Sequence, residues 1–262
     1  ARGLTKVFGP GCPHCFAATG PAAGTNLCPR CRSVVACQGI DVDLYAGEVL
    51  GIVGESGSGK STVVRLLHFD WEATAGAVTL QPNGRAAGRR EAGGVDLAAL
   101  EGRNLLELSA YRRRQVRNAV MGIVFQNPHL GLKLHISAGG NIAERLLAAG
   151  WRQVEAIRQR AGHLLERTEV PRGRMDEPPA RFSGGMQQRV QIAKALSNEP
   201  LVLLLDELTT GLDVSVQARV LDLVRQLQQE LQVATLVVSH DLGVIRMLTR
   251  RTLVMKDGRV VE

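Results

Sequence analysis

The stretch Gly54-Glu55-Ser56-Gly57-Ser58-Gly59-Lys60-Ser61 follows directly on the apolar run 49–53. Its pattern, G-x-x-x-x-G-K-[S/T] between a buried strand and a helix, is typical of a loop that wraps phosphate groups with backbone N–H groups. Glycines are needed because such a loop adopts dihedral angles that side chains disfavour. The predicted helix directs its positive dipole end at the same phosphates. We therefore predict a nucleotide-binding loop in which Lys60 contacts the β- and γ-phosphates and Ser61 ligates magnesium.

The composition is that of one folded α/β core with subdomains, in a chain of 262 residues with 45% apolar residues and a net charge of +7. No apolar run reaches the roughly 20 residues that cross a bilayer, and no signal peptide opens the chain, so we expect a cytoplasmic location. The positive charge is weak evidence for nucleic acid, which we do not expect as a partner. Because residues 4–8 already read as a strand end, we expect both ends to be trimmed.

Four cysteines form two C-x-x-C pairs around a connector of low apolar content: Cys12, Cys15, Cys28 and Cys31. Four thiolates at this spacing suit a tetrahedral zinc ion, which supplies the folding energy that the segment lacks. Because four protein ligands leave no open coordination position, the expected role is structural. A redox dithiol or disulfides are the alternative. We assign residues 11–37 to an inserted zinc knuckle lobe and read Cys37 as a core thiol.

Polar residues follow three predicted core strands. Gln126 follows 121–125, Asp206 and Glu207 follow 201–205, and His240 follows 234–239. The carboxyl ends of parallel strands are where ligands bind. Two adjacent carboxylates at such an end are costly to bury without a cation. Asp206 suits the magnesium shell and Glu207 suits polarising an attacking water, which is the division of roles that phosphoryl transfer requires.

Other segments give weaker signals. Helical periodicity over 137–168 predicts a helical subdomain, which we bound at 127–182. Ser183-Gly184-Gly185 opens a long helix whose start suits phosphate, although by itself it is only a capped helix. Phe8 either stacks on a purine ring or is a core residue, with equal weight. Residues 76–84 predict an antiparallel strand and turn, and 85–103 predict a surface insertion.

In this order the motifs resemble those of the ATP-binding cassette (ABC) ATPases over nearly the whole chain. The correspondences are Gly54 to Ser61 with the Walker A loop, Gln126 with the Q-loop, Ser183 to Gln187 with the signature, Leu203 to Glu207 with Walker B, Gly211-Leu212-Asp213 with the D-loop, His240 with the H-loop and Phe8 with the A-loop aromatic. The resemblance implies an α/β P-loop NTPase fold over 1–262, with a RecA-like core, an antiparallel β subdomain, the helical subdomain and the inserted zinc lobe.

The resemblance also implies a mechanism: ATP hydrolysis in a head-to-tail homodimer, each ATP lying between the Walker A loop of one chain and the signature of the other. Gln126 and His240 then sense magnesium, water and the γ-phosphate, and Asp213 acts across the interface. The implied nucleotide-binding residues are Phe8, Gly54, Glu55, Ser56, Gly57, Ser58, Gly59, Lys60, Ser61, Thr62, Gln126, Ser183, Gly184, Gly185, Gln187, Asp206 and Asp213. The implied catalytic residues are Lys60, Gln126, Glu207 and His240, and the implied magnesium ligands are Ser61, Gln126 and Asp206.

Within the ABC ATPases the chain resembles the ATPase K subunits of bacterial carbon-phosphorus lyase systems for phosphonate breakdown, through residues 136–146, 182–192 and 211–219. It departs from the general pattern in the cysteine lobe and in Leu208, where a proline usually follows the Walker B glutamate. The resemblance implies an ATPase that moves lyase core subunits. The alternative is the motor of a dipeptide or oligopeptide importer, with a membrane permease as partner. A cassette that binds nucleic acid through the zinc lobe and the Arg112 to Arg117 cluster is the least supported alternative.

Overall fold

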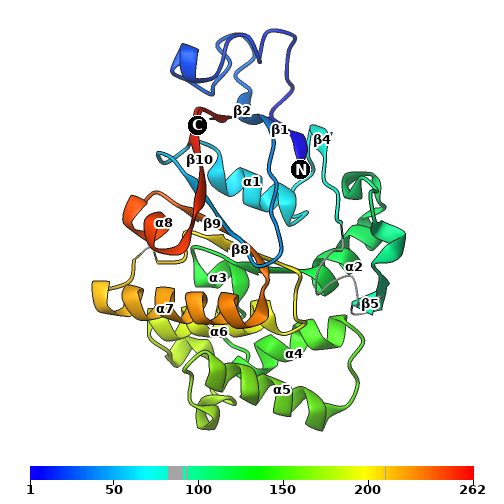
Figure 1. Cartoon of the computed structure of the whole chain (residues 1–262), viewed down its shortest axis with the longest axis vertical. Coiled ribbons are helices and arrows are strands. Elements are labelled where there is room, and N and C mark those ends of the chain that lie inside the picture. Colours follow the sequence, from blue (N-terminus) through cyan, green and yellow to red (C-terminus); the bar gives the residue numbers. More distant parts are fainter. Residues whose placement is uncertain (82–90, 93, 210) are drawn as a thin grey trace.

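The computed structural model describes residues 1–81, 91–92, 94–209 and 211–262, whose arrangement is shown in Figure 1. Over these residues the central sheet has six strands in the order β11-β10-β3-β9-β8-β7. Neighbours run parallel except for the final hairpin of β10 and β11. Its strands are β3 (Val49–Val53), β7 (Met121–Val124), β8 (Val202–Asp206), β9 (Ala234–Ser239), β10 (Arg251–Lys256) and β11 (Arg259–Val260). This confirms the predicted α/β class.

In the described part of the chain, two smaller antiparallel sheets accompany it. The first has the order β2-β1-β4, with β1 (Arg2–Phe8), β2 (Val34–Ile40) and β4 (Ala75–Ala77). The second pairs β5 (Glu91–Ala92) with β6 (Val95–Asp96). The long connection from β1 to β2 carries the cysteines and projects from the end of the molecule in Figure 1, opposite the helices α4 and α5.

The helices are α1 (Lys60–Leu67), α2 (Ala110–Val120), α3 (Pro128–Gly131), α4 (Ala138–Ala148), α5 (Val154–Arg167), α6 (Gly184–Leu196), α7 (Val214–Leu231) and α8 (Leu242–Leu248). Short 3-10 turns cover Pro21–Ala23, Ala98–Leu100, Leu105–Glu107, Arg172–Arg174 and Pro179–Arg181. Among the described residues, none of these helices has the length and apolar character to cross a membrane.

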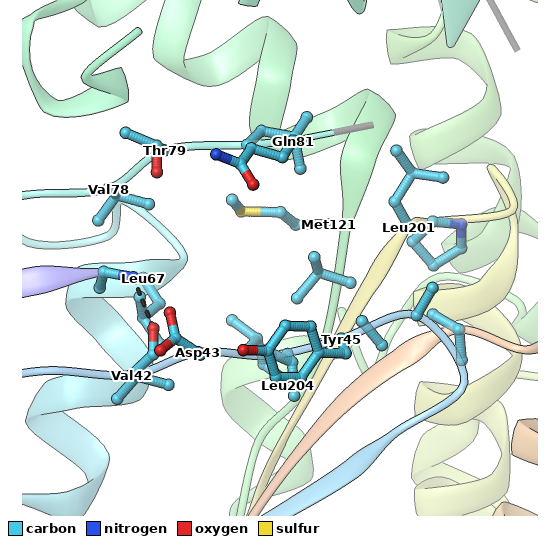
Figure 2. A pocket seen from close by; sticks show the side chains of 18 of the residues that line it. Val42, Asp43, Tyr45, Leu67, Val78, Thr79, Gln81, Met121, Leu201 and Leu204 are labelled. Carbon is cyan, nitrogen blue, oxygen red and sulfur yellow. Dashed lines mark hydrogen bonds between the residues drawn. The ribbon is translucent and has the colours of Figure 1, made fainter. Parts of the chain in front are cut away.

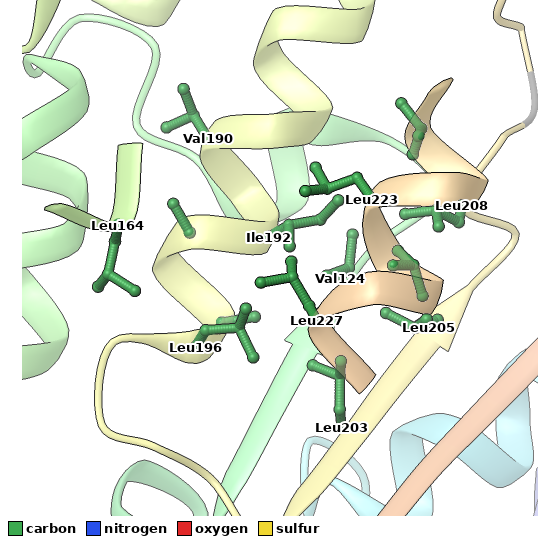
Figure 3. Close-up of a cluster of buried hydrophobic side chains, with 14 of the residues drawn as sticks. Val124, Leu164, Val190, Ile192, Leu196, Leu203, Leu205, Leu208, Leu223 and Leu227 are labelled. Carbon is green, nitrogen blue, oxygen red and sulfur yellow. The ribbon is translucent and has the colours of Figure 1, made fainter. Parts of the chain in front are cut away.

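Side chains of the central strands alternate between two hydrophobic cores. Leu203 and Leu205 of β8 face the core with α6 and α7, as Figure 3 shows, whereas Leu204 faces the core with α1 and α2. A strand with both faces covered is apolar throughout, which explains the unbroken Val202 to Leu205 run. The two cores hold β8 rigidly, so the carboxylates at its end have a fixed position.

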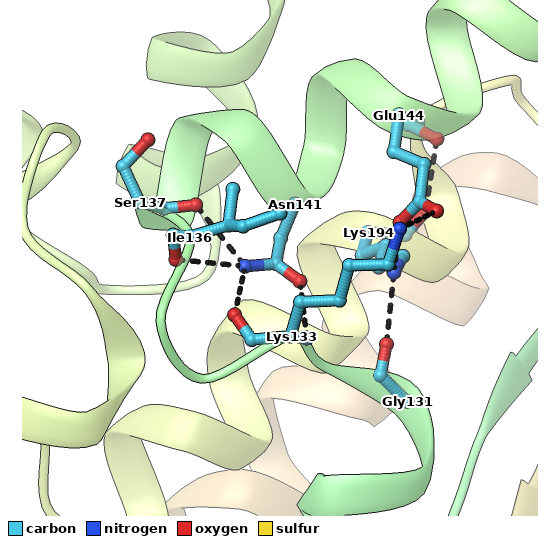
Figure 4. A network of polar contacts seen from close by, with 8 residues as sticks. Gly131, Lys133, Ile136, Ser137, Asn141, Glu144 and Lys194 are labelled. Carbon is cyan, nitrogen blue, oxygen red and sulfur yellow. Dashed lines mark hydrogen bonds and ion pairs between the residues drawn. The ribbon is translucent and has the colours of Figure 1, made fainter.

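A buried asparagine organises the loop ahead of α4. The side-chain Nδ2 of Asn141 donates to the carbonyl oxygens of Lys133, Ile136 and Ser137 at 3.0 to 3.1 Å, and its Oδ1 accepts from the Lys133 N–H at 2.8 Å (Figure 4). Asn141 is fully buried, so these bonds satisfy an otherwise costly amide. Asn141 belongs to the stretch 136–146, which carries part of the resemblance to the ATPase K subunits, and its role there is to hold the loop before α4.

The surface insertion predicted at 85–103 is wrong only in part: most of its described residues from 94 onward are exposed, but three are buried. The predicted turn at 82–84, residues 85–90 and residue 93 lie outside the described residues. Beyond them Val95, Leu97 and Leu100 are buried in the core with α1 and α2. These apolar residues stand singly among glycines and alanines and show no periodicity, so the sequence pattern does not predict their burial.

Candidate functional site

The predicted phosphate loop links β3 to α1. The Nζ of Lys60 donates to the carbonyl oxygens of Gly54 and Glu55, at 2.7 Å each, and the side chain is only 4% exposed. Burial lowers the pKa of Lys60, and the carboxylates of Glu207 and Asp206 act against this shift. The loop therefore holds a buried cation beside two carboxylates at the start of a helix.

Two glycines of the loop admit no side chain. A Cβ on Gly54 would lie 2.1 Å from the Met255 carbonyl oxygen, and a Cβ on Gly59 would lie 2.1 Å from that of Ala36. Gly59 also has a φ of +101°, which disfavours other residues. The loop is pressed against β2 and β10, so both glycines of the motif are required by packing.

The first carboxylate, Asp206, ends β8 and lies beside the loop. The Oγ of Ser61 donates to its Oδ1 at 2.8 Å. Asp206 is 3% exposed; this burial raises its pKa, and the hydrogen bond from Ser61 acts in the opposite direction. A hydroxyl and a buried carboxylate in contact are hard oxygen donors of the kind that magnesium prefers.

The second carboxylate, Glu207, turns out of the strand. Its φ is +48°, a conformation that costs a non-glycine residue on the order of 1 kcal/mol, and its N–H donates to the Val238 carbonyl at 2.9 Å. The next residue, Leu208, is buried, and its carbonyl accepts from the Nε2 of Gln188 at 3.0 Å. These contacts hold the turn without the usual proline.

Three parallel strands bring three predicted side chains together at their carboxyl ends. The Nε2 of Gln126, after β7, donates to the Oε2 of Glu207 at 2.8 Å. The Nδ1 of His240, after β9, lies 3.3 Å from the same oxygen. An amide and an imidazole thus converge on one carboxylate oxygen, an arrangement suited to orienting a water and taking its proton.

These residues line a pocket of about 590 Å³. Its lining comprises Phe8, Asn26, Val34, Ala36, Ser56, Gly57, Gly59, Lys60, Ser61, Thr62, Gln126, Glu207 and His240. Phe8 is 38% exposed and packs on Trp71 in a T-shaped arrangement at a ring-centroid distance of 5.2 Å, so it is not a core residue. Gly54, Glu55, Ser58 and Asp206 support the pocket without lining it.

Sequence reasoning missed Asn26, Val34 and Ala36. They enter the pocket because the cysteine segment and β2 fold back over the phosphate loop. No local pattern marks such a long-range contact.

The predicted signature lies away from this pocket. Ser183 caps α6, its Oγ accepting from the Met186 N–H at 3.4 Å, and the Nε2 of Gln187 donates to the Pro179 carbonyl at 2.9 Å. Ser183, Gly184, Gly185, Gln187 and Asp213 are not among the lining residues. Within one chain, therefore, the signature does not complete the site.

A larger cavity, of about 680 Å³, is lined by Met121, Val202 and Ala234, the first residues of β7, β8 and β9 (Figure 2). Val42, Tyr45, Leu67, Met121 and Leu204 contribute to its mainly aliphatic wall. None of the predicted site residues is among its described lining.

The cysteine sulfurs form a cluster. Their Sγ atoms lie 3.6 Å apart for Cys12 and Cys15, 3.7 Å for Cys12 and Cys28, and 3.4 Å for Cys15 and Cys31, all within 4.8 Å of one another. Sulfurs bound tetrahedrally about 2.3 Å from zinc are separated by about 3.8 Å, so the cluster can hold such an ion. Cys37 lies apart, and its burial raises its pKa to about 12.

The sequence profile of the ABC transporter family matches residues 37–210. This chain belongs to the ABC transporter family. It is therefore an ABC ATPase domain, an ATP-hydrolysing P-loop enzyme of a family that binds ATP with magnesium. The match begins at residue 37, so the cysteine cluster lies ahead of the part that the family profile covers.

Relatives of this ABC ATPase domain differ in function. A protein of Escherichia coli (strain K12) named as the phosphonates utilization ATP-binding protein PhnK is 47% identical over 223 residues, covering 85% of this chain and 81% of PhnK. The oligopeptide transport ATP-binding protein OppD of Bacillus subtilis (strain 168) is 37% identical over 231 residues. That match covers 87% of this chain but only 60% of OppD.

Among solved structures, the dimeric ATP-binding cassette MJ0796 bound to ADP and Pi aligns with a TM-score of 0.76 and 26% identity, covering 100% of this chain and 95% of that one. ABC ATPase domains dimerise, as MJ0796 does.

Proposed function

We propose that this chain is the ATP-binding and ATP-hydrolysing subunit that drives conformational change in a carbon-phosphorus lyase complex for phosphonate degradation. The convergence of Gln126 and His240 on Glu207, in the pocket of Lys60 and Ser61, carries the proposal. The phosphonate assignment is supported by the similarity to PhnK, which is higher in identity than that to OppD and covers more of the relative's own length, 81% against 60%.

In the proposed reaction, water attacks the γ-phosphorus of ATP, the bond from that phosphorus to the β-phosphate oxygen breaks, and ADP and inorganic phosphate leave. Glu207 accepts the proton of the water, while Gln126 and His240 orient it. Lys60 exchanges its two carbonyl partners for the β- and γ-phosphates. Magnesium, when bound, would neutralise phosphate charge. Ser61, Asp206 and Gln126 would hold the ion.

The second half of each site comes from a second copy of the chain. The Ser183-Gly184-Gly185 helix start lies outside the pocket of its own chain and presents N–H groups suited to phosphate. In the head-to-tail homodimer it faces the nucleotide held on the partner, and Asp213, before α7, lies at the interface. ATP closes this dimer and hydrolysis opens it, which is the movement passed to other subunits.

The four clustered cysteines hold one structural zinc ion in a lobe spanning 11–37. The sulfur separations, close to those of a tetrahedral thiolate site, support this assignment. Elemental analysis of protein purified without chelator should give one zinc per chain, and its absence would reject the assignment.

A second candidate is the motor of a dipeptide or oligopeptide importer, which the similarity to OppD favours. In that case the helical subdomain, 127–182, engages a membrane permease. Purification of the tagged chain from its own host separates the two: lyase core subunits should accompany it, whereas an integral membrane permease in their place would favour the importer.

A further inference from the structure

A side chain of the cysteine lobe hydrogen-bonds to the backbone of the phosphate loop. The Nδ2 of Asn26 donates to the Gly57 carbonyl oxygen at 3.3 Å, across 31 positions of sequence. Asn26 also lines the pocket, next to Val34 and Ala36. The lobe therefore forms part of the wall of the nucleotide pocket, although it lies ahead of the residues that match the family profile.

The contact falls at a position of the loop with little packing of its own. Gly57 has a φ of +83°, and a Cβ built on it would meet no atom within 4 Å. The peptide unit between Gly57 and Ser58 is held at both ends, since its carbonyl accepts from Asn26 and its N–H donates to the Glu55 carbonyl at 3.2 Å. Fixing this unit preorganises the loop around an anion.

Asn26 is in turn positioned by the fold of the lobe. Its carbonyl accepts from the Val35 N–H at 2.8 Å, and two residues later the Cys28 N–H donates to the Ser33 carbonyl at 2.8 Å. Among the described residues, the apolar cluster of the lobe has three buried members, Cys15, Cys28 and Val35. A segment with so small a core depends on its metal for order.

An arginine ties the same lobe to the final hairpin. The Nη2 of Arg259 donates to the Phe16 carbonyl at 2.8 Å and to the Gln38 Oε1 at 2.9 Å. The neighbouring Gly258 N–H donates to the Ser58 carbonyl at 3.0 Å. Lobe, hairpin and phosphate loop thus form one connected unit.

We propose that Asn26 is a positioning residue of the nucleotide site, and that the metal held by the cysteine cluster raises nucleotide affinity by holding Asn26 against Gly57. This inference rests on the proposed ATP site. It gives the lobe a role in the site itself, beyond stabilising its own fold.

The test compares affinity for a fluorescent ATP analogue, N-methylanthraniloyl-ATP with magnesium, between wild type and variants of the full chain. Asn26→Ala removes the donor, and Asn26→Asp keeps the size while placing a carboxylate by the carbonyl. Ala22→Asn, which adds an amide on an exposed turn of the same lobe, is the matched control. Zinc content and melting temperature are measured for each, before and after removal of the metal by a chelator.

Asn26→Ala should weaken binding about three- to tenfold, as expected for one lost hydrogen bond, with zinc content and melting temperature unchanged. Asn26→Asp should weaken it more, and Ala22→Asn should bind like wild type. Metal removal should weaken binding by wild type but weaken binding by Asn26→Ala far less, because the contact is already lost.

Wild-type affinity in Asn26→Ala, together with equal effects of metal removal on both proteins, would overturn the inference. Failure of the ATP site itself is distinguished by Lys60→Ala. If wild type binds the analogue no better than Lys60→Ala, the proposed function fails instead.

Discussion

The side-chain amide of Gln126 donates to the Oε2 of Glu207 at 2.8 Å, which joins the ends of the neighbouring parallel strands β7 and β8. Because the same oxygen lies 3.3 Å from the Nδ1 of His240, Glu207 is held from both sides. A carboxylate so oriented can accept a proton from a water in the pocket without first moving.

Replacing this carboxylate by its amide should separate binding from turnover. Glu207→Gln keeps the size of the side chain and an oxygen that accepts from Gln126, so ATP affinity should be retained. It removes the base, so the rate of phosphate release should fall roughly 100-fold or more. Glu155→Gln, at the exposed start of α5, should hydrolyse ATP like wild type. Undiminished turnover in Glu207→Gln would exclude Glu207 as the base.

Two glycines of the phosphate loop should differ in their tolerance of alanine. A Cβ at position 57 would have no atom within 4 Å, so Gly57→Ala is strained only by the φ of +83°, which costs about 1 kcal/mol. Gly59→Ala has a φ of +101° and also forces a Cβ to 2.1 Å from the Ala36 carbonyl, so the free energy of unfolding should fall further, by roughly 3 kcal/mol or more. Urea unfolding of both variants measures the difference. Equal stabilities would contradict the packing argument.

The meeting of Gln126, Glu207 and His240 could be predicted from the sequence because parallel strands end at one edge of the sheet, whatever their order. The order of the strands themselves, β3-β9-β8-β7, was not predicted, since periodicity reports which faces are buried and not which strands pair. From composition alone, Phe8 could be a core residue or a residue that stacks on a purine ring. The structure places it in the pocket wall, where its ring contacts Trp71 and remains 38% exposed.

The contact between Asn26 and Gly57 could not be predicted. A surface asparagine in a segment of low complexity carries no periodic or spacing signal, and its partner is a backbone carbonyl that any residue would supply. Only the folding of the lobe over the loop brings the two together. The burial of Val95, Leu97 and Leu100 was missed for a similar reason, since no local pattern marks their packing into the core with α1 and α2.

The proposed dimer predicts that a change at the signature will affect hydrolysis but not binding. Ser183→Arg places a bulky side chain at the exposed start of α6 and removes a helix cap, at a cost of about 1 kcal/mol. Ser137→Arg removes the equivalent cap of α4 and serves as the control. Both should bind ATP as monomers. Only Ser183→Arg should lose ATP turnover and the rise of specific activity with protein concentration, and retention of both would argue against a shared site.

The five cysteines should fall into two chemical classes, which thiol titration can count. With the proposed zinc ion bound, no thiol of the native protein should react quickly, because four sulfurs would be ligands and Cys37 is fully buried with its pKa raised to about 12. A chelator at neutral pH should expose the four clustered thiols while leaving Cys37 protected, and denaturant should then release the fifth. Cys37→Ser should remove only that last thiol.

Two outcomes would contradict this scheme. Four thiols that react rapidly before any chelator is added would contradict a bound metal. A fifth thiol that reacts before denaturant is added would contradict the burial of Cys37.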